Sequence, residues 1–99
     1  MNKLQLTASI VERSLVRYTP AGIPLISATL HHCKKVIEAS ISRQVDMMID
    51  AIAVGETSGK LESCKIGTDT LFTGFLAKKS RNTRALVFHI TALHKIGEF

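Results

Sequence analysis

A regular alternation of apolar and polar residues limits the folds open to this chain more than any other feature. In Leu4–Ile10 every second residue is apolar and the residues between are polar, which is the pattern of a strand with one buried face. Similar strand patterns recur at Leu25–His32, Gln44–Val54, Thr70–Ala77 and Ala85–Lys95. Because these five segments lie within only 99 residues, we expect a small all-β protein.

The segments between the predicted strands indicate how the strands connect. Both prolines and a glycine lie in Tyr18–Pro24, which predicts a turn. Lys34–Ser42 mixes charged and small polar residues, so we expect a long loop there, and Gly55–Lys65 has room for a helical turn or two. Five strands with a long connection between the third and the fourth are typical of the OB type of barrel. The sequence therefore predicts a five-stranded Greek-key OB-fold barrel, with residues 1–99 forming a single domain.

Composition excludes several classes of protein. With 45% hydrophobic and 21% charged residues, the chain is globular rather than disordered. No apolar run approaches the roughly 18 residues that cross a bilayer, and the N-terminal residues lack the apolar centre of a signal peptide. Cys33 and Cys64 form no recognisable disulfide framework. We therefore expect a cytoplasmic protein with free thiols.

The net positive charge is concentrated toward the C-terminal end. The chain carries a net charge of +5, and no Asp or Glu lies between Thr70 and Ile96. Four basic residues lie in Lys78–Arg84, between two predicted strands. A basic loop held by a sheet is suited to bind a polyanion such as nucleic acid, although a solvated basic surface has the same composition.

Other basic residues and one aromatic ring extend this candidate site. Loops between the second and third and between the fourth and fifth strands of an OB barrel can lie on the side of its ligand groove. Tyr18 is the ring that we expect to be exposed, whereas Phe72, Phe75 and Phe88 lie inside apolar strands and are expected in the core. Binding would then depend mainly on phosphate charge and be nearly independent of base sequence. The candidate binding residues are Arg17, Tyr18, Lys34, Lys35, Arg43, Lys78, Lys79, Arg81 and Arg84.

Patterns that would indicate an enzyme or a metalloprotein are incomplete. Gly55–Leu61 resembles a phosphate-binding P-loop, but three residues rather than four separate its glycines, and Leu61 replaces the hydroxyl residue that would hold magnesium. His31 and His32 are adjacent and would point to opposite faces of a strand, so they do not have the spacing of a zinc site. No Gly-x-Ser-x-Gly motif is present. We expect no enzyme activity, no cofactor and no metal site.

Two segments resemble the bacterial single-stranded DNA-binding proteins. Arg17–Pro24, followed by the apolar Leu25–Leu30, is similar to the first hairpin of that family. Ile66–Ala77 is similar to the family's fourth strand, in which a glycine allows tight curvature of the barrel. The turn, the Gly-Phe-Leu segment before the basic loop and the end of the chain at Gly97–Phe99, without a disordered tail, look most like the primosomal members of this family.

The resemblance implies a function and a set of partners. The primosomal members are non-catalytic homodimers that bind single-stranded DNA and support the PriA helicase and other primosome proteins in replication restart. Ile41–Met48 lacks the aromatic residues that the family often places there and carries Asp46, while Cys33 stands where a basic residue would help. We therefore expect modest affinity for single strands. By motif position, the resemblance implies DNA contacts at Arg17, Arg43, Lys78, Lys79, Arg81 and Arg84.

The sequence is also compatible with two alternative functions, and the family implies a homodimer. A general single-stranded DNA-binding protein is one alternative, although that class normally carries a long disordered tail with an acidic tip. An OB-fold interaction module whose basic surface binds RNA or an acidic protein is the other. The family and the small core imply a homodimer, and we expect Leu4–Ile10 to pair as an unprotected apolar edge strand.

Overall fold

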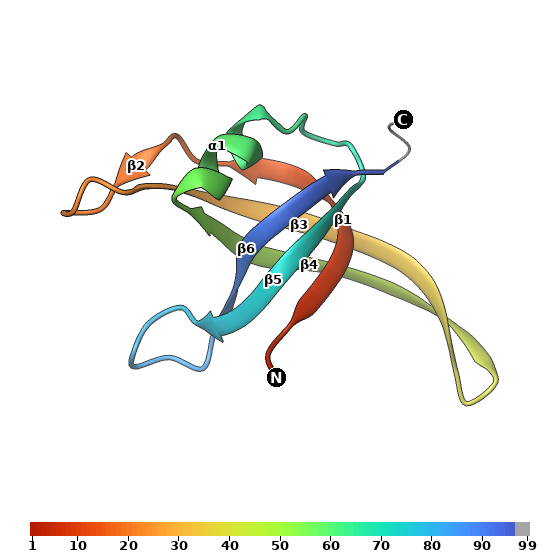
Figure 1. The fold of residues 1–99 in the computed structure, drawn as a ribbon. Coiled ribbons are helices and arrows are strands. Elements are labelled where there is room, and N and C mark those ends of the chain that lie inside the picture. Colours follow the sequence, from red (N-terminus) through yellow and green to blue (C-terminus); the bar gives the residue numbers. More distant parts are fainter. Residues whose placement is uncertain (97–99) are drawn as a thin grey trace.

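The fold is a strongly curved barrel with one short helix, as the computed structural model shows for residues 1–96 (Figure 1). The helix of these described residues is not long and apolar enough to cross a membrane. In chain order the elements are β1 (Leu4–Arg13), β2 (Arg17–Tyr18), β3 (Pro24–Glu38), β4 (Ile41–Val54), α1 (Glu56–Ser63), β5 (Thr70–Lys78) and β6 (Leu86–Lys95). Residues 97–99, where the absence of a disordered tail is expected, lie outside the described residues.

The barrel closes through β1. Its first half, Leu4–Ala8, pairs antiparallel with β5. Its second half pairs antiparallel with β3 from Ser9 to Arg13, with a register shift between Ile10 and Glu12. The strand order is β1-β5-β6-β4-β3, with the short β2 beside β3. The predicted all-β, five-stranded OB-fold barrel is therefore confirmed. The expectation that Leu4–Ile10 is an unprotected edge holds for a shorter segment, because β5 covers one edge of Leu4–Ala8 and β3 pairs with Ser9 and Ile10. Within residues 1–96, the other edge of Leu4–Ala8 has no ladder partner.

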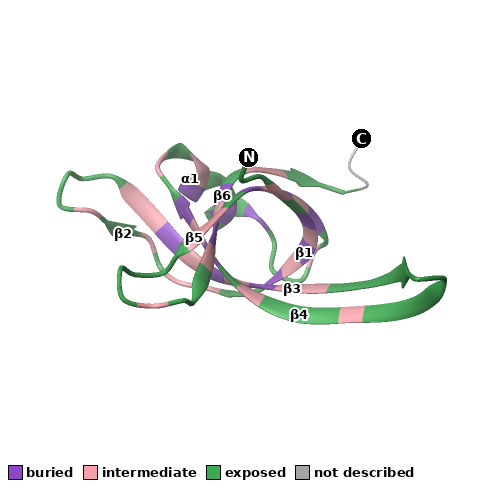
Figure 2. Ribbon diagram, turned by 90° about the horizontal axis from the view of Figure 1, so that it is seen from below, coloured by how far each residue is buried: buried purple, intermediate pink, exposed green. Residues whose placement is uncertain are grey.

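The connection between β3 and β4 differs from its prediction. Lys34–Ser42 is not a loop, because the two strands continue as a paired ribbon up to Glu38 and Ile41. Ala39 and Ser40 make the turn, with φ values of 52° and 64°, as a two-residue hairpin turn requires. Ala-Ser lacks the Asn-Gly signature of such turns, and the ribbon is exposed on both faces near its tip (Figure 2). Neither turn chemistry nor burial therefore left a signal in the sequence.

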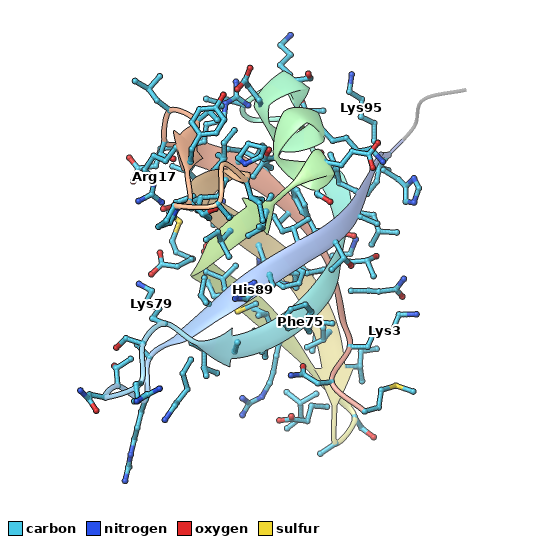
Figure 3. All side chains as sticks on the ribbon, turned by 60° about the vertical axis from the view of Figure 1, so that its left-hand side comes forward. Lys3, Arg17, Phe75, Lys79, His89 and Lys95 are labelled. Atoms are coloured by element: carbon cyan, nitrogen blue, oxygen red, sulfur yellow. The ribbon has the colours of Figure 1, made fainter. Side chains whose placement is uncertain are left out.

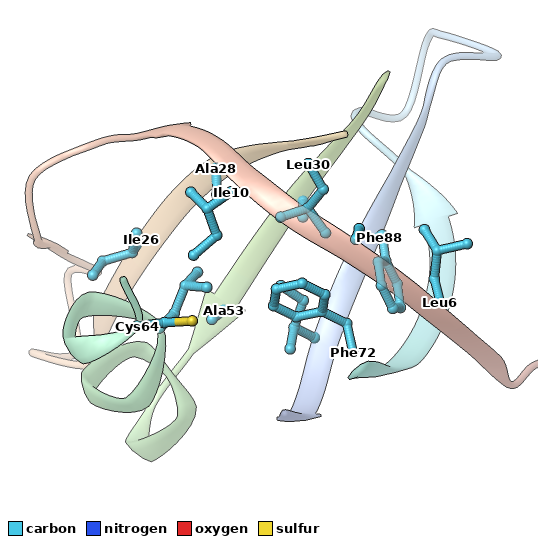
Figure 4. Close-up of a cluster of buried hydrophobic side chains, with 13 residues drawn as sticks. Leu6, Ile10, Ile26, Ala28, Leu30, Ala53, Cys64, Phe72 and Phe88 are labelled. Atoms are coloured by element: carbon cyan, nitrogen blue, oxygen red, sulfur yellow. The ribbon is translucent and has the colours of Figure 1, made fainter. Parts of the chain in front are cut away.

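The core fills the inside of the barrel with small aliphatic residues and two aromatic rings (Figure 4). Phe72 and Phe88 are fully buried, as predicted. The helix α1 confirms the expected turn or two of helix in Gly55–Lys65 and adds buried Leu61 to this core. The Arg13 guanidinium donates hydrogen bonds to the backbone oxygens of Leu61 and Cys64. These bonds satisfy carbonyls at the end of the helix and attach it to β1.

Gly74 lies at an irregularity in the pairing of β5 with β6. A Cβ atom at this position would lie 1.8 Å from the backbone oxygen of His89, so only glycine is compatible with this approach. The β5–β6 register shifts here, from Thr73 opposite Ala92 to Gly74 opposite Ile90, which is a β-bulge. A β-bulge bends its strand, in keeping with the curvature that the resemblance implies at this glycine.

Phe75 corrects the sequence prediction. It follows the inward-facing Gly74, so the alternation along β5 directs its side chain outward, and 37% of the residue is exposed. The prediction that Phe75 belongs to the core is wrong. The prediction relied on the apolar content of the strand. Phe75 lies three residues after the buried Phe72, and this odd spacing places the two side chains on opposite faces of the strand.

Candidate nucleic-acid interface

A groove of about 740 Å³ crosses the outer face of the barrel. Its centre is formed by the three neighbouring strands β3, β4 and β6. The C-terminal end of β1 and the following Ser14 border it beside β3, and Lys78 and Lys79 border it beside β6. Acidic residues line the groove beside these lysines, since Glu12 and Asp50 are among its residues. The groove therefore joins a sheet surface to the start of the basic β5–β6 loop.

One row of outward side chains runs across these strands and continues onto β5. The ladder pairs Ser27 with Ile52, Ile52 with His89, and His89 with Phe75. The rings of Phe75 and His89 stack in parallel, with centroids 4.8 Å apart and an interplanar angle of 8°. Figure 3 shows these two rings between Arg17 and Lys79 on one side and Lys3 on the other. The row thus combines a flat aromatic surface with cations at both ends.

The β5–β6 loop carries the predicted basic residues, and two of them are held in place. The Lys78 ammonium donates a hydrogen bond of 3.2 Å to the backbone oxygen of Arg81. The Lys79 ammonium forms an ion pair with Asp50, in the groove. Within residues 1–96, the side chains of Arg81 and Arg84 are exposed and have no ion-pair or hydrogen-bond partner. The loop therefore presents two guanidinium groups that are unpaired within the described residues, close to Lys79, whose charge is balanced by Asp50.

The turn after β1 adds one cation and one ring near the groove. The Arg17 guanidinium donates a hydrogen bond of 2.6 Å to the hydroxyl of Ser27, the first residue of the row. Tyr18 pairs with Pro24 in the short β2–β3 ladder, and 69% of it is exposed. The prediction that Tyr18 is an exposed ring is confirmed.

The basic residues of the β3–β4 ribbon do not form a single patch. Alternate residues of a strand point to opposite faces. Lys35 lies on the face that continues from Ser27, whereas Lys34 and Arg43 lie on the opposite face. Arg43 is also paired with Glu38, at 3.3 Å between Nε and Oε1. The structure therefore brings Arg17 and the β5–β6 loop to the groove, with Lys35 further along the same face.

Comparisons with known proteins agree with this architecture. A family model for "another single-strand binding protein family" matches residues 2–92. A replication restart protein PriB from Nitrosomonas europaea is 36% identical over 89 residues, which cover 90% of this chain and 82% of the relative. The chain therefore belongs to this family of single-strand binding proteins.

Solved structures narrow the assignment. A PriB structure from Ralstonia solanacearum superimposes with a TM-score of 0.87 at 41% identity and covers 97% of this chain and 98% of that chain. A single-stranded DNA binding protein from Thermus aquaticus shares the fold, with a TM-score of 0.74 at 16% identity, 97% coverage of this chain and 50% of that chain. Within the family, the chain belongs with the PriB proteins, which confirms the predicted resemblance.

Proposed function

We propose that this chain is a non-catalytic, cytoplasmic accessory protein of the primosome that binds single-stranded DNA and supports the PriA helicase in replication restart. Membership of the PriB branch supports this role. The observation that carries the binding function is the row from Ser27 to Phe75, which crosses the outer face of the barrel and has cations at both ends.

In this proposal a single strand lies along the row, and phosphates and bases are bound by different groups. The flat Phe75–His89 pair offers one free face on which a base can stack. Arg17, Arg81 and Arg84 contact phosphates, and Lys79 exchanges its ion pair with Asp50 for a phosphate. Stacking and phosphate contacts do not distinguish bases by their edges, so binding is nearly independent of sequence.

The β3–β4 ribbon extends the proposed path. Lys35 continues the groove face and provides a further phosphate contact. Lys34 and Arg43 lie on the reverse face, so they reach a strand only where it passes around the ribbon. That reverse face also remains available for the helicase while DNA occupies the groove face.

We also propose a homodimer. Along Leu4–Ala8, β5 occupies one edge of β1. No ladder partner occupies the other edge in residues 1–96, where the imidazole of His32 makes a single contact of 2.6 Å with the Thr7 oxygen. An edge of this kind can pair with a second copy. Light scattering at micromolar concentration tests this directly, and a monomer would remove the proposal.

The DNA proposal is tested by fluorescence anisotropy with a labelled single strand and the matching duplex across a salt series. The variant with Lys78, Lys79, Arg81 and Arg84 replaced by Ala should lose most binding. About four phosphate contacts on a single strand correspond to a log–log salt slope of about −3, which this variant should flatten. A Lys60→Ala, Lys65→Ala variant is the control, because both residues are exposed and neither lines the groove. It removes two charges rather than four, so the losses are compared per charge removed.

Each outcome of this test has a distinct meaning. Equal loss in the control variant would show that only overall charge matters and would refute the groove assignment. Equal affinity for single strands, duplex DNA and structured RNA would favour the general interaction module instead. With single-strand binding established, stimulation of PriA unwinding on a forked substrate tests the helicase role. Its absence would favour a general single-strand binding protein.

A further inference from the structure

Three residues with metal-ligand chemistry meet on the groove face of the β3–β4 ribbon. His31 and Cys33 are two residues apart on β3, so they share a face, and Asp46 lies directly opposite Cys33 on β4. The His31 Nε2 atom lies 2.8 Å from the Asp46 Oδ1 atom. One ligand atom from each residue lies within 4.8 Å of the other two. Neither His32 nor Cys64 is part of this cluster. The spacing of histidines and the spacing of cysteines, each considered separately, did not indicate a site that combines one of each with Asp46.

We propose that His31, Cys33 and Asp46 bind a Zn²⁺ ion, with a water molecule as the fourth ligand. Imidazole, thiolate and carboxylate are all ligands of zinc, whereas Mg²⁺ and Ca²⁺ prefer oxygen alone. Three protein ligands and one solvent position is an arrangement that zinc adopts. These three ligands therefore favour zinc over Mg²⁺ and Ca²⁺, because a thiolate binds such hard cations poorly.

The distances permit this coordination without a change of backbone. Zinc lies about 2.0–2.3 Å from its nitrogen, oxygen and sulfur ligands, so tetrahedral neighbours are about 3.3–3.7 Å apart. Atoms that now lie up to 4.8 Å apart therefore need to approach by about 1.1–1.5 Å. The His31 and Asp46 atoms, now 2.8 Å apart, need to separate by about 0.5 Å or more. Cys33 and Asp46 are exposed, so rotation of their side chains supplies this movement. The continuous β3–β4 ladder on either side keeps the Cα positions fixed.

A neighbouring side chain supports the thiolate. The Gln44 amide lies on the same face of β4 as Asp46 and donates a hydrogen bond of 2.8 Å to the Cys33 sulfur. Hydrogen bonds to an ionised acceptor are stronger than those to a neutral one, so this bond stabilises the thiolate that zinc requires. Groups that orient metal ligands in this way contribute to metal affinity.

Metal binding also changes the charge of the ribbon. Zinc binds cysteine as the thiolate and histidine as the neutral imidazole. On binding, the thiol proton passes to solvent, and the thiolate and the carboxylate together balance the two charges of the ion. The cluster with its bound ion is neutral, and binding releases protons to solvent.

Titration of the untagged full chain with Zn²⁺ alone, in a phosphine reductant, tests the site. We expect one ion per chain, with proton release visible as a dependence of the binding heat on the buffer. Co²⁺ in place of zinc should give the thiolate-to-metal absorption band that reports a cysteine ligand. Cys33→Ser and Asp46→Asn should each lower zinc affinity by about tenfold or more. Circular dichroism of the metal-free variants confirms that they are folded.

His94→Gln is the matched control, because His94 is exposed and lies on β6 outside the cluster. It should leave both the affinity and the cobalt spectrum unchanged. Two results would overturn the proposal. One is the absence of zinc binding at micromolar concentration. The other is unchanged binding in Cys33→Ser, which would assign the metal to other groups such as the retained Cys64.

Discussion

Replacement of Phe75 by Leu tests the proposed stacking surface separately from charge. Leu keeps apolar bulk at the position but removes the flat ring. His89 already covers one face of the ring, so only one face is free, and the substitution removes the stacking of a single base. Base–aromatic stacking contributes about 1–3 kcal/mol per base. Because only 37% of Phe75 is exposed, we take the lower part of this range, about 1–1.5 kcal/mol.

This free energy corresponds to an increase in Kd of about 5–12-fold, measured by fluorescence anisotropy with a labelled single strand at one salt concentration. The salt slope should stay as in the unchanged chain, because no charge is removed. Urea unfolding is the control for the fold, and the change in stability should stay within about 1 kcal/mol, since Phe75 lies outside the core. A Kd within twofold of the original, with the fold intact, would refute the role of the ring.

Three further predictions concern the bend, the groove and the ribbon. Gly74→Ala should lower the free energy of unfolding in urea by about 3 kcal/mol or more, because its Cβ would overlap the His89 backbone oxygen 1.8 Å away; a loss below about 1 kcal/mol would contradict this close approach. Asp50→Asn should release Lys79 and strengthen single-strand binding by up to about fivefold in anisotropy titrations at low salt, with the gain vanishing at high salt. Lys35→Ala should weaken binding and make the salt slope shallower by about 0.7, whereas Arg43→Ala, on the reverse face, should change neither; an equal effect of the two would mean that DNA contacts both faces.

The barrel was predictable because burial on one face leaves a period of two in the sequence. Ile26, Ala28 and Leu30 carry this pattern and are all buried. The tip of the β3–β4 ribbon, Lys34–Ser42, has no buried face, so it left no such pattern and was expected to be a loop. Burial of one face was thus the physical condition for a strand to be visible in the sequence.

The candidate sites were less predictable because they depend on register. The basic residues of the β5–β6 loop were found from charge alone, and Tyr18 from its place beside a turn. Cys33 and Asp46 face one another only because the turn falls at Ala39 and Ser40, which composition does not specify. The aromatic row likewise depends on which residues of β4, β5 and β6 are neighbours.

The closure of the barrel by β1 also determines the order in which the chain can fold. Leu4 pairs with Gly74, whereas the β3–β4 ribbon needs only a two-residue turn. Local pairs form before pairs that close long loops, so the ribbon can assemble early and β1 must wait for β5. During synthesis, the apolar side of Leu4–Ala8 stays uncovered until residues beyond Lys78 have left the ribosome. The N-terminal strand is therefore the segment most exposed to aggregation and to chaperones while the protein is being made.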